Sequence, residues 1–167
     1  GGSLGAKTIN ESVQAGLQKL ENANIQLIWQ TGKGYFDKVK SFANIHKGLI
    51  IKDFIYEMNL AYACADVVIS RAGALSISEL CLAEKPTILV PSPNVAEDHQ
   101  TKNALALTSQ NAALLVKDIE AKNTLIDNAL ALLQDEAQQQ KLKQNIKTFA
   151  QLNADETIVK EILKLVK

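Results

Sequence analysis

The stretch SRAGALSISEL, residues 70–80, is expected to decide the fold of this chain. Immediately before it, residues 66–69 (DVVI) are apolar and β-branched, which predicts a short buried strand. After it, residues 74–83 are rich in helix formers. Their apolar side chains are expected to pack: Leu75, Ile77, Leu80 and Leu82. Gly73 separates the two elements, at a point where a backbone can bend sharply or let a ligand approach closely. The order strand, glycine turn, helix predicts an α/β unit.

The start of this predicted helix suits a phosphate group. The first N–H groups of a helix lack internal partners, and the helix dipole adds positive charge there. Ser76 and Ser78 can add hydroxyl donors. Glu79 would repel a phosphate, but its carboxylate can accept hydrogen bonds from the vicinal hydroxyls of a ribose. Together these features indicate a nucleotide; the alternative is an ordinary α/β turn with a solvated helical glutamate.

Composition narrows the class of protein. The chain has 167 residues, of which 47% are hydrophobic, and a formal net charge of zero. A packed domain is therefore expected, and nucleic acid is not an expected partner. No apolar run is long enough to cross a bilayer. Cys64 and Cys81 stand in apolar helical contexts and are predicted to be buried and reduced, and His46 and His99 are too isolated to predict a metal site.

A second glycine loop, GGSLGA, opens the sequence at residues 1–6. An amphipathic helix is predicted after it, from Thr8 to Leu20, so a phosphate could meet its N–H groups and the Ser3 hydroxyl. A flexible end remains the alternative. Loops of this kind normally follow a strand, and the only methionine is Met58. We therefore expect this sequence to be part of a longer protein.

Short apolar runs alternate with helical patterns along the rest of the chain. Strands are predicted at 25–30, 48–55, 87–90 and 112–116, and helices at 35–42, 56–65, 98–108, 124–133, 136–150 and 155–166, with Asp98 as an N-cap. This alternation predicts a Rossmann-like parallel sheet with helices on both faces. Ligands bind at the carboxyl ends of such strands. Four loops meet there: 1–6, the segment at Ile55, 71–73 and the segment at 99–100.

Several motifs in this order resemble the MurG family of peptidoglycan N-acetylglucosaminyltransferases, specifically its C-terminal half. They are GGSLGA at 1–6, Phe54-Ile55 with Met58, SRAGALSISE at 70–79, Pro86, Val90-Pro91, and Asp98-His99-Gln100 with Asn103-Ala104. The block at 70–79 with the spaced His-Gln is the specific part of this signature. The resemblance implies the C-terminal domain of a GT-B glycosyltransferase, occupying residues 1–167, that binds the donor UDP-GlcNAc.

The resemblance also implies a role for each matching position. Ser3 would contact the donor diphosphate, and the backbone of Ile55 would read the uracil edge. The start of the central helix would form the phosphate and nucleoside cradle: Ala74, Leu75, Ser76, Ile77 and Ser78. Glu79 would bind the ribose hydroxyls. Gln100, with His99 beside it, would bind the GlcNAc hydroxyls; His99 departs from the glutamine of some relatives, and a structural histidine at the helix start is its alternative.

The family's acceptor site and presumed general base lie in an N-terminal domain that has no counterpart in this sequence. The resemblance thus implies no catalytic residue here, no cofactor and no metal. It implies that the full-length enzyme converts lipid I to lipid II while held peripherally on the cytoplasmic face of the inner membrane. Three other readings stay open: the donor-binding subunit of a split GlcNAc transferase, half of a UDP-GlcNAc 2-epimerase, and a non-catalytic Rossmann-like nucleotide-binding module.

Overall fold

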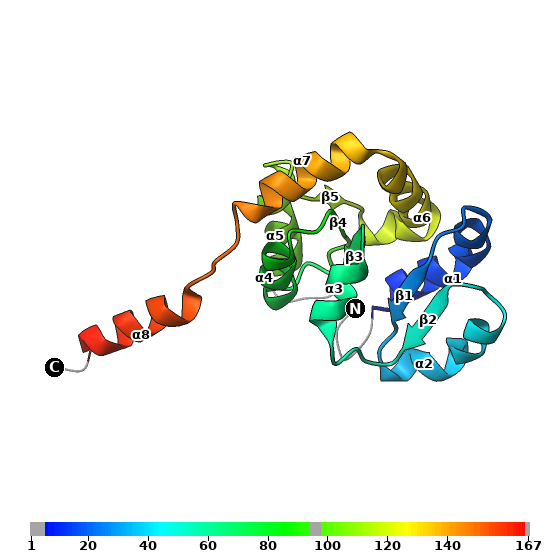
Figure 1. Ribbon diagram of the computed structural model, residues 1–167, viewed down its shortest axis with the longest axis horizontal. Helices are drawn as coiled ribbons and strands as arrows, with labels where there is room; N and C mark the ends of the chain where they lie inside the picture. Colours follow the sequence, from blue (N-terminus) through cyan, green and yellow to red (C-terminus); the bar gives the residue numbers. More distant parts are fainter. Residues whose placement is uncertain (1–5, 94–97, 166–167) are drawn as a thin grey trace.

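The computed structural model describes residues 6–93 and 98–165 (Figure 1). Helices and strands alternate along most of the chain. In order, they are α1 (Lys7–Asn22), β1 (Leu27–Gln30), α2 (Lys33–Val39), the 3-10 helix η1 (Lys40–Asn44), β2 (Leu49–Lys52), α3 (Met58–Cys64), β3 (Val68–Ser70), α4 (Ala74–Ala83), β4 (Thr87–Leu89), α5 (His99–Thr108), β5 (Leu114–Leu115), α6 (Asp118–Gln134), α7 (Glu136–Lys147) and α8 (Ala154–Leu165). The predicted helix at 74–83 is confirmed to the residue.

The described strands are all parallel, as predicted, but they form two sheets rather than one. β1 pairs with β2, from Leu27 opposite Leu49 onwards, and the larger sheet has the order β3-β4-β5. Each parallel pair is joined through a helix, which is the connection that parallel strands require. The alternation of side chains leaves Ile28 and Ile50 outward on the smaller sheet, 41% and 51% exposed.

The core lies on both faces of the larger sheet, because successive residues of β4 point in opposite directions. Ile88 and Val90 belong to a cluster with α1 and α6, and Leu89 belongs to one with α4 and α5. Helices therefore cover both faces of this sheet, as predicted. Within the first cluster α1 packs closely against α6, and Gly16 faces Ile126 where they meet.

Two local predictions are wrong, and the prediction for Asp98 holds for its position alone. Leu75 is 82% and Leu82 49% exposed, because α4 packs on the core only through the face that carries Ile77, Leu80 and Cys81.

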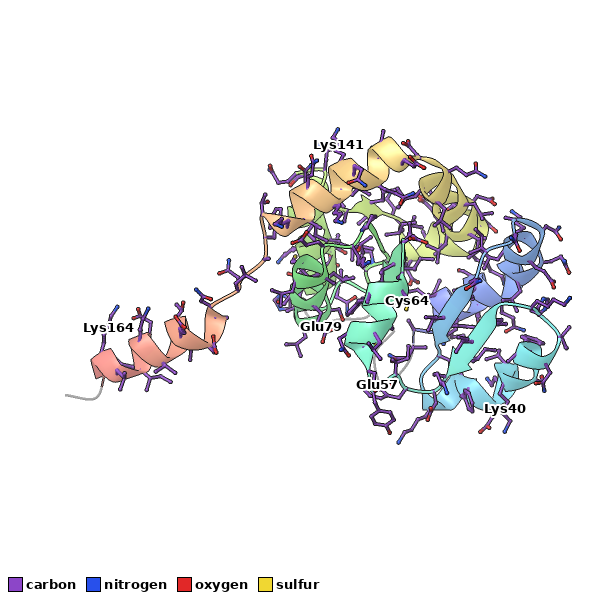
Figure 2. All side chains as sticks on the ribbon, viewed as in Figure 1. Lys40, Glu57, Cys64, Glu79, Lys141 and Lys164 are labelled. Atoms are coloured by element: carbon purple, nitrogen blue, oxygen red, sulfur yellow. The ribbon has the colours of Figure 1, made fainter. Side chains whose placement is uncertain are left out.

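Cys64 is exposed rather than buried, since it ends a helix that buries none of its side chains fully (Figure 2). Asp98 stands at the N-cap of α5, but its backbone is left-handed (φ 54°) and its side chain makes no capping bond.

The last helix, α8, extends away from the other elements (Figure 1), and every side chain described in it is exposed. Its apolar side chains include Ile158, Ile162 and Leu165. Among the helices of the described residues, none combines the length and the apolar character needed to cross a membrane.

Candidate functional site

The turn between β3 and α4 presents free backbone donors. The first backbone bond of α4 runs from the Ile77 N–H to the Gly73 carbonyl oxygen at 2.9 Å. The N–H groups of residues 74–76 precede that bond and have no acceptor in the described part of the chain. Gly73 has φ −69° and ψ 147°, so the turn does not need a glycine for its backbone angles. A Cβ there would meet only the Ser76 Oγ, at 4.0 Å, so the glycine leaves room for a ligand beside the helix start.

The two serines of α4 differ in what they can donate. The Ser78 hydroxyl donates to the Ala74 carbonyl oxygen at 3.1 Å. It is therefore already used as a donor inside the helix, which corrects the expectation that both serines offer one. The Ser76 hydroxyl makes no hydrogen bond with any other described residue.

Helix α5 holds the turn from the other side. Gln100 Oε1 accepts hydrogen bonds from the backbone N–H of Ala72 at 3.3 Å and of Ser92 at 2.9 Å. Asn103 Nδ2 donates to the Ala72 carbonyl oxygen at 3.1 Å, so both backbone groups of this fully buried residue are paired. The side-chain oxygen of Gln100 thus has a structural task. Among the described residues, its side-chain NH2 group is left as a donor. His99 is exposed beside it at the first residue of α5.

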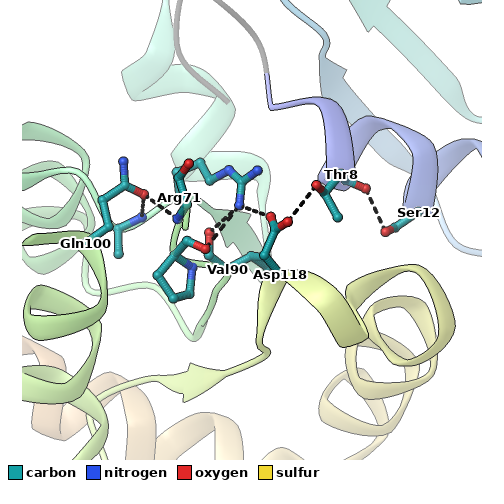
Figure 3. Close-up of polar contacts among 9 residues, drawn as sticks. Thr8, Ser12, Arg71, Val90, Gln100 and Asp118 are labelled. Carbon is teal, nitrogen blue, oxygen red and sulfur yellow. Dashed lines mark hydrogen bonds and ion pairs between the residues drawn. The ribbon is translucent and has the colours of Figure 1, made fainter. Parts of the chain in front are cut away.

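Arg71 connects this turn to α1 and α6. Its guanidinium donates to the Val90 carbonyl oxygen at 3.0 Å and forms an ion pair with Asp118, the first residue of α6. Asp118 also accepts the Thr8 hydroxyl at 2.9 Å (Figure 3). The start of α1 and the turn before α4 therefore lie at the two ends of one chain of contacts. Ser3 lies outside the described residues.

Glu79 stands on the exposed side of α4 (Figure 2), and its carboxylate has one partner in the described residues. Tyr62 of α3 donates its hydroxyl to Glu79 Oε2 at 3.0 Å. Burial is the main cause that raises the pKa of Tyr62, followed by the hydrogen bond and the negative charge of Glu79. Sequence reasoning missed Tyr62, because a helical pattern does not tell on which neighbouring helix a ring will pack.

Ile55 follows β2, and its backbone is only partly free. Its N–H donates to Gln30 Oε1 at 2.9 Å, at the end of β1. The Ile55 carbonyl oxygen has no such bond among the described residues, so it is the group that can accept from a base edge. These contacts join Ile55 to β1, not to the turn before α4.

The described residues contain no group of three or more His, Cys, Asp or Glu side chains placed to hold a metal ion. The polar groups at this turn and along α4 are the backbone donors of residues 74–76, the exposed carboxylate of Glu79 and the side-chain amide of Gln100. This set of groups can bind an anion next to a polyhydroxyl group.

Comparisons with known proteins agree with each other. The family model of the glycosyltransferase family 28 C-terminal domain matches residues 1–162. Two relatives carry the name UDP-N-acetylglucosamine–N-acetylmuramyl-(pentapeptide) pyrophosphoryl-undecaprenol N-acetylglucosamine transferase. The one from Cytophaga hutchinsonii is 53% identical and the one from Porphyromonas gingivalis W83 is 54% identical, each over 99% of this chain. The chain spans 44% of the length of each relative.

Two solved structures are similar in fold. The crystal structure of Acinetobacter baumannii MurG superposes with a TM-score of 0.82 at 30% identity, over 98% of this chain and 48% of that one. The glycotransferase of kitacinnamycin superposes with a TM-score of 0.66 at 15% identity, over 89% of this chain and 38% of that one, which shows a shared fold alone.

Proposed function

Because this chain belongs to the family of glycosyltransferase family 28 C-terminal domains, we propose that it binds the sugar-nucleotide donor of an N-acetylglucosaminyltransferase. The family match confirms the resemblance drawn from the sequence motifs. We propose UDP-GlcNAc as the donor and residues 1–167 as one donor-binding domain. The proposed reaction of the full-length protein is transfer of GlcNAc from this donor to lipid I, which gives lipid II and releases UDP. The relatives' names favour this transferase over an epimerase or a non-catalytic module.

The observation that carries the proposal is the arrangement along α4. Open N–H groups at residues 74–76 offer a phosphate site, and Glu79 stands five residues after Ala74, the first of them. At 1.5 Å per residue this is about 7.5 Å along the helix, comparable to the span from a 5′-phosphate to the ribose hydroxyls. The positive end of the helix dipole suits the diphosphate of a nucleoside diphosphate, and the carboxylate about one and a half turns later suits its ribose.

The other contacts are assigned by the same reasoning. The Ile55 carbonyl oxygen would accept the uracil N3–H, while Ile77 and Ser78 complete the wall of the cradle. The Gln100 amide group would donate to a sugar hydroxyl, with His99 at the rim. Ser3 is assigned to the diphosphate from the resemblance.

We expect this chain to contribute to catalysis by stabilising the leaving group. In an inverting transfer the acceptor hydroxyl attacks the anomeric carbon as the bond to UDP breaks. Fixed N–H groups and a helix dipole can stabilise the negative charge that develops on the departing diphosphate. We propose that the base that takes the acceptor proton, the lipid I site and the peripheral contact with the cytoplasmic membrane face lie outside this chain. The chain alone is then expected to bind the donor without transferring the sugar.

Calorimetric titration tests the proposal. The chain is titrated with UDP-GlcNAc, UDP-glucose and ADP-glucose, and the series is repeated on Glu79→Gln. Glu136→Gln is the matched control, because Glu136 is an exposed glutamate on α7, away from this site.

We expect saturable binding of UDP-GlcNAc, weaker binding of UDP-glucose and none of ADP-glucose. Glu79→Gln should weaken UDP-GlcNAc binding at least tenfold, or about 1.4 kcal/mol, and Glu136→Gln should not change it. Equal affinity for all three ligands, or no binding of any, would contradict the proposal.

A further inference from the structure

Tyr62 is partly buried, and its hydroxyl donates a hydrogen bond to the exposed carboxylate of Glu79. Its ring packs against the cluster that contains Ala72, Leu80 and Cys81. Its hydroxyl donates to Glu79 Oε2 at 3.0 Å, across the contact between α3 and α4. Tyr62 is therefore held by packing of its ring against a core cluster, whereas Glu79 is exposed on the surface of α4.

This arrangement limits the freedom of Glu79. An exposed glutamate samples many side-chain rotamers, and ordering it on binding a ligand costs free energy. A tyrosine has two side-chain torsions, and here its ring is already held by packing. The hydrogen bond restricts the rotamers of the Glu79 side chain, so the side chain loses less conformational entropy when a ligand binds.

The same bond leaves most of the carboxylate available. A carboxylate offers about four lone-pair positions on two oxygens. Tyr62 has one proton to donate and occupies one position on Oε2. No other described residue bonds Glu79, so Oε1 and the remaining position on Oε2 can accept two hydroxyls of a 1,2-diol.

We propose that Tyr62 is a positioning residue for ribose recognition, which orients the Glu79 carboxylate to accept the 2′- and 3′-hydroxyls of the nucleotide. This inference rests on the proposed function, since it needs a nucleotide with Glu79 at its ribose. Tyr62 does not touch the ligand in this arrangement; it acts through Glu79. A tyrosine hydroxyl, with an ordinary pKa of about 10, keeps its proton to donate at neutral pH. Burial and the neighbouring carboxylate raise the pKa of Tyr62 further.

The test compares two ligands on the same variants. UDP has both ribose hydroxyls, and 2′,3′-dideoxy-UDP has neither. Calorimetric titration of both ligands is carried out on the wild-type chain, Tyr62→Phe and Glu79→Gln. Tyr35→Phe is the matched control, because it removes a hydroxyl that donates to Gln14 at 2.6 Å, between α2 and α1 rather than between α3 and α4.

We expect Tyr62→Phe to weaken UDP binding three- to tenfold and to leave dideoxy-UDP binding unchanged. A purely structural role, such as holding α3 against α4, would weaken both ligands alike and would overturn the proposal. An unchanged affinity of Tyr62→Phe for UDP would also overturn it, while the donor-binding function would stand if Glu79→Gln still lost UDP affinity. If the wild-type chain bound neither ligand, the proposed function would fail and this inference with it.

Discussion

Arg71 and Asp118 form an ion pair that joins the turn before α4 to the first residue of α6. The two side chains are 16% and 18% exposed. Arg71 also donates to the carbonyl oxygens of Val90 and Pro91, and Asp118 also accepts from Thr8 (Figure 3). Four segments that are far apart in the sequence thus meet at one guanidinium and one carboxylate, next to the proposed diphosphate site.

Arg71→Ala is expected to destabilise the fold by about 2–4 kcal/mol, because it leaves a largely buried carboxylate and two carbonyl oxygens without their donor. Urea unfolding followed by circular dichroism measures the loss. Lys19→Ala is the control, since Lys19 pairs with Asp127 at 2.7 Å where both side chains are more than half exposed. That change should cost less than about 1 kcal/mol. Similar losses for the two variants would contradict this ranking.

Gly16→Ala should destabilise the contact between α1 and α6. An added Cβ would lie 2.5 Å from Ile126 Cγ1, so one of the two helices must shift. We expect a net loss of about 1–3 kcal/mol, although alanine is the better helix former. The same substitution at Gly34, where nothing lies within 4 Å, should instead stabilise the chain by up to about 1 kcal/mol.

The double variant Gly16→Ala with Ile126→Ala removes the atom that clashes. Thermal unfolding should show it to be more stable than the sum of the two single losses predicts. Strict additivity would mean that Gly16 is required for a reason other than the packing of Ile126.

Two substitutions at Gln100 should separate its structural task from its proposed sugar contact. Gln100→Ala leaves the Ala72 and Ser92 N–H groups without their acceptor and should cost about 1–3 kcal/mol of stability. Gln100→Glu keeps an acceptor for both groups and loses the amide donor. We expect it to fold with nearly wild-type stability and to bind UDP more weakly, because the new negative charge lies beside the proposed diphosphate site. In addition, it should lose the added affinity that the GlcNAc group confers. The quantity to measure is the ratio of the dissociation constants for UDP and UDP-GlcNAc. An unchanged ratio in Gln100→Glu would show that Gln100 does not contact the sugar.

The two cysteines should react at different rates with a thiol reagent such as DTNB. Cys64 is exposed, whereas Cys81 is 1% exposed and burial raises the pKa of its thiol. Because the thiolate is the reactive form, we expect one fast equivalent in the native chain and a second only on unfolding. Cys64→Ser should abolish the fast phase. Two fast equivalents in the native state would show that the α4 side of the core opens readily.

Local patterns were enough to predict most elements. Apolar runs and helical spacing located the described strands and helices, and the helix at 74–83 was predicted with its observed bounds. The parallel direction followed from the alternation of strands and helices, since parallel strands need a crossover. Element ends were less accurate, as at β5, where two residues form the strand predicted over 112–116.

Burial and hydrogen-bond partners could not be predicted in the same way. Leu75 and Cys64 have apolar character, but which face of a short helix packs depends on its neighbours. The sequence also offers Ser78 as a donor, yet its hydroxyl is taken by the carbonyl one turn back, which is common for serine in helices.

By itself, the sequence determined the order of the elements, the glycine turn before α4 and the carboxylate on that helix, because each depends on residues that are close along the chain. Tertiary structure alone decided that Tyr62 meets Glu79, that Gln100 holds the turn and that Arg71 meets Asp118. These pairs are separated by 17, 8 and 47 positions, counting Gln100 to Ser92. Such contacts form only when packed helices and strands bring two polar groups to hydrogen-bond distance, and no local pattern encodes that distance.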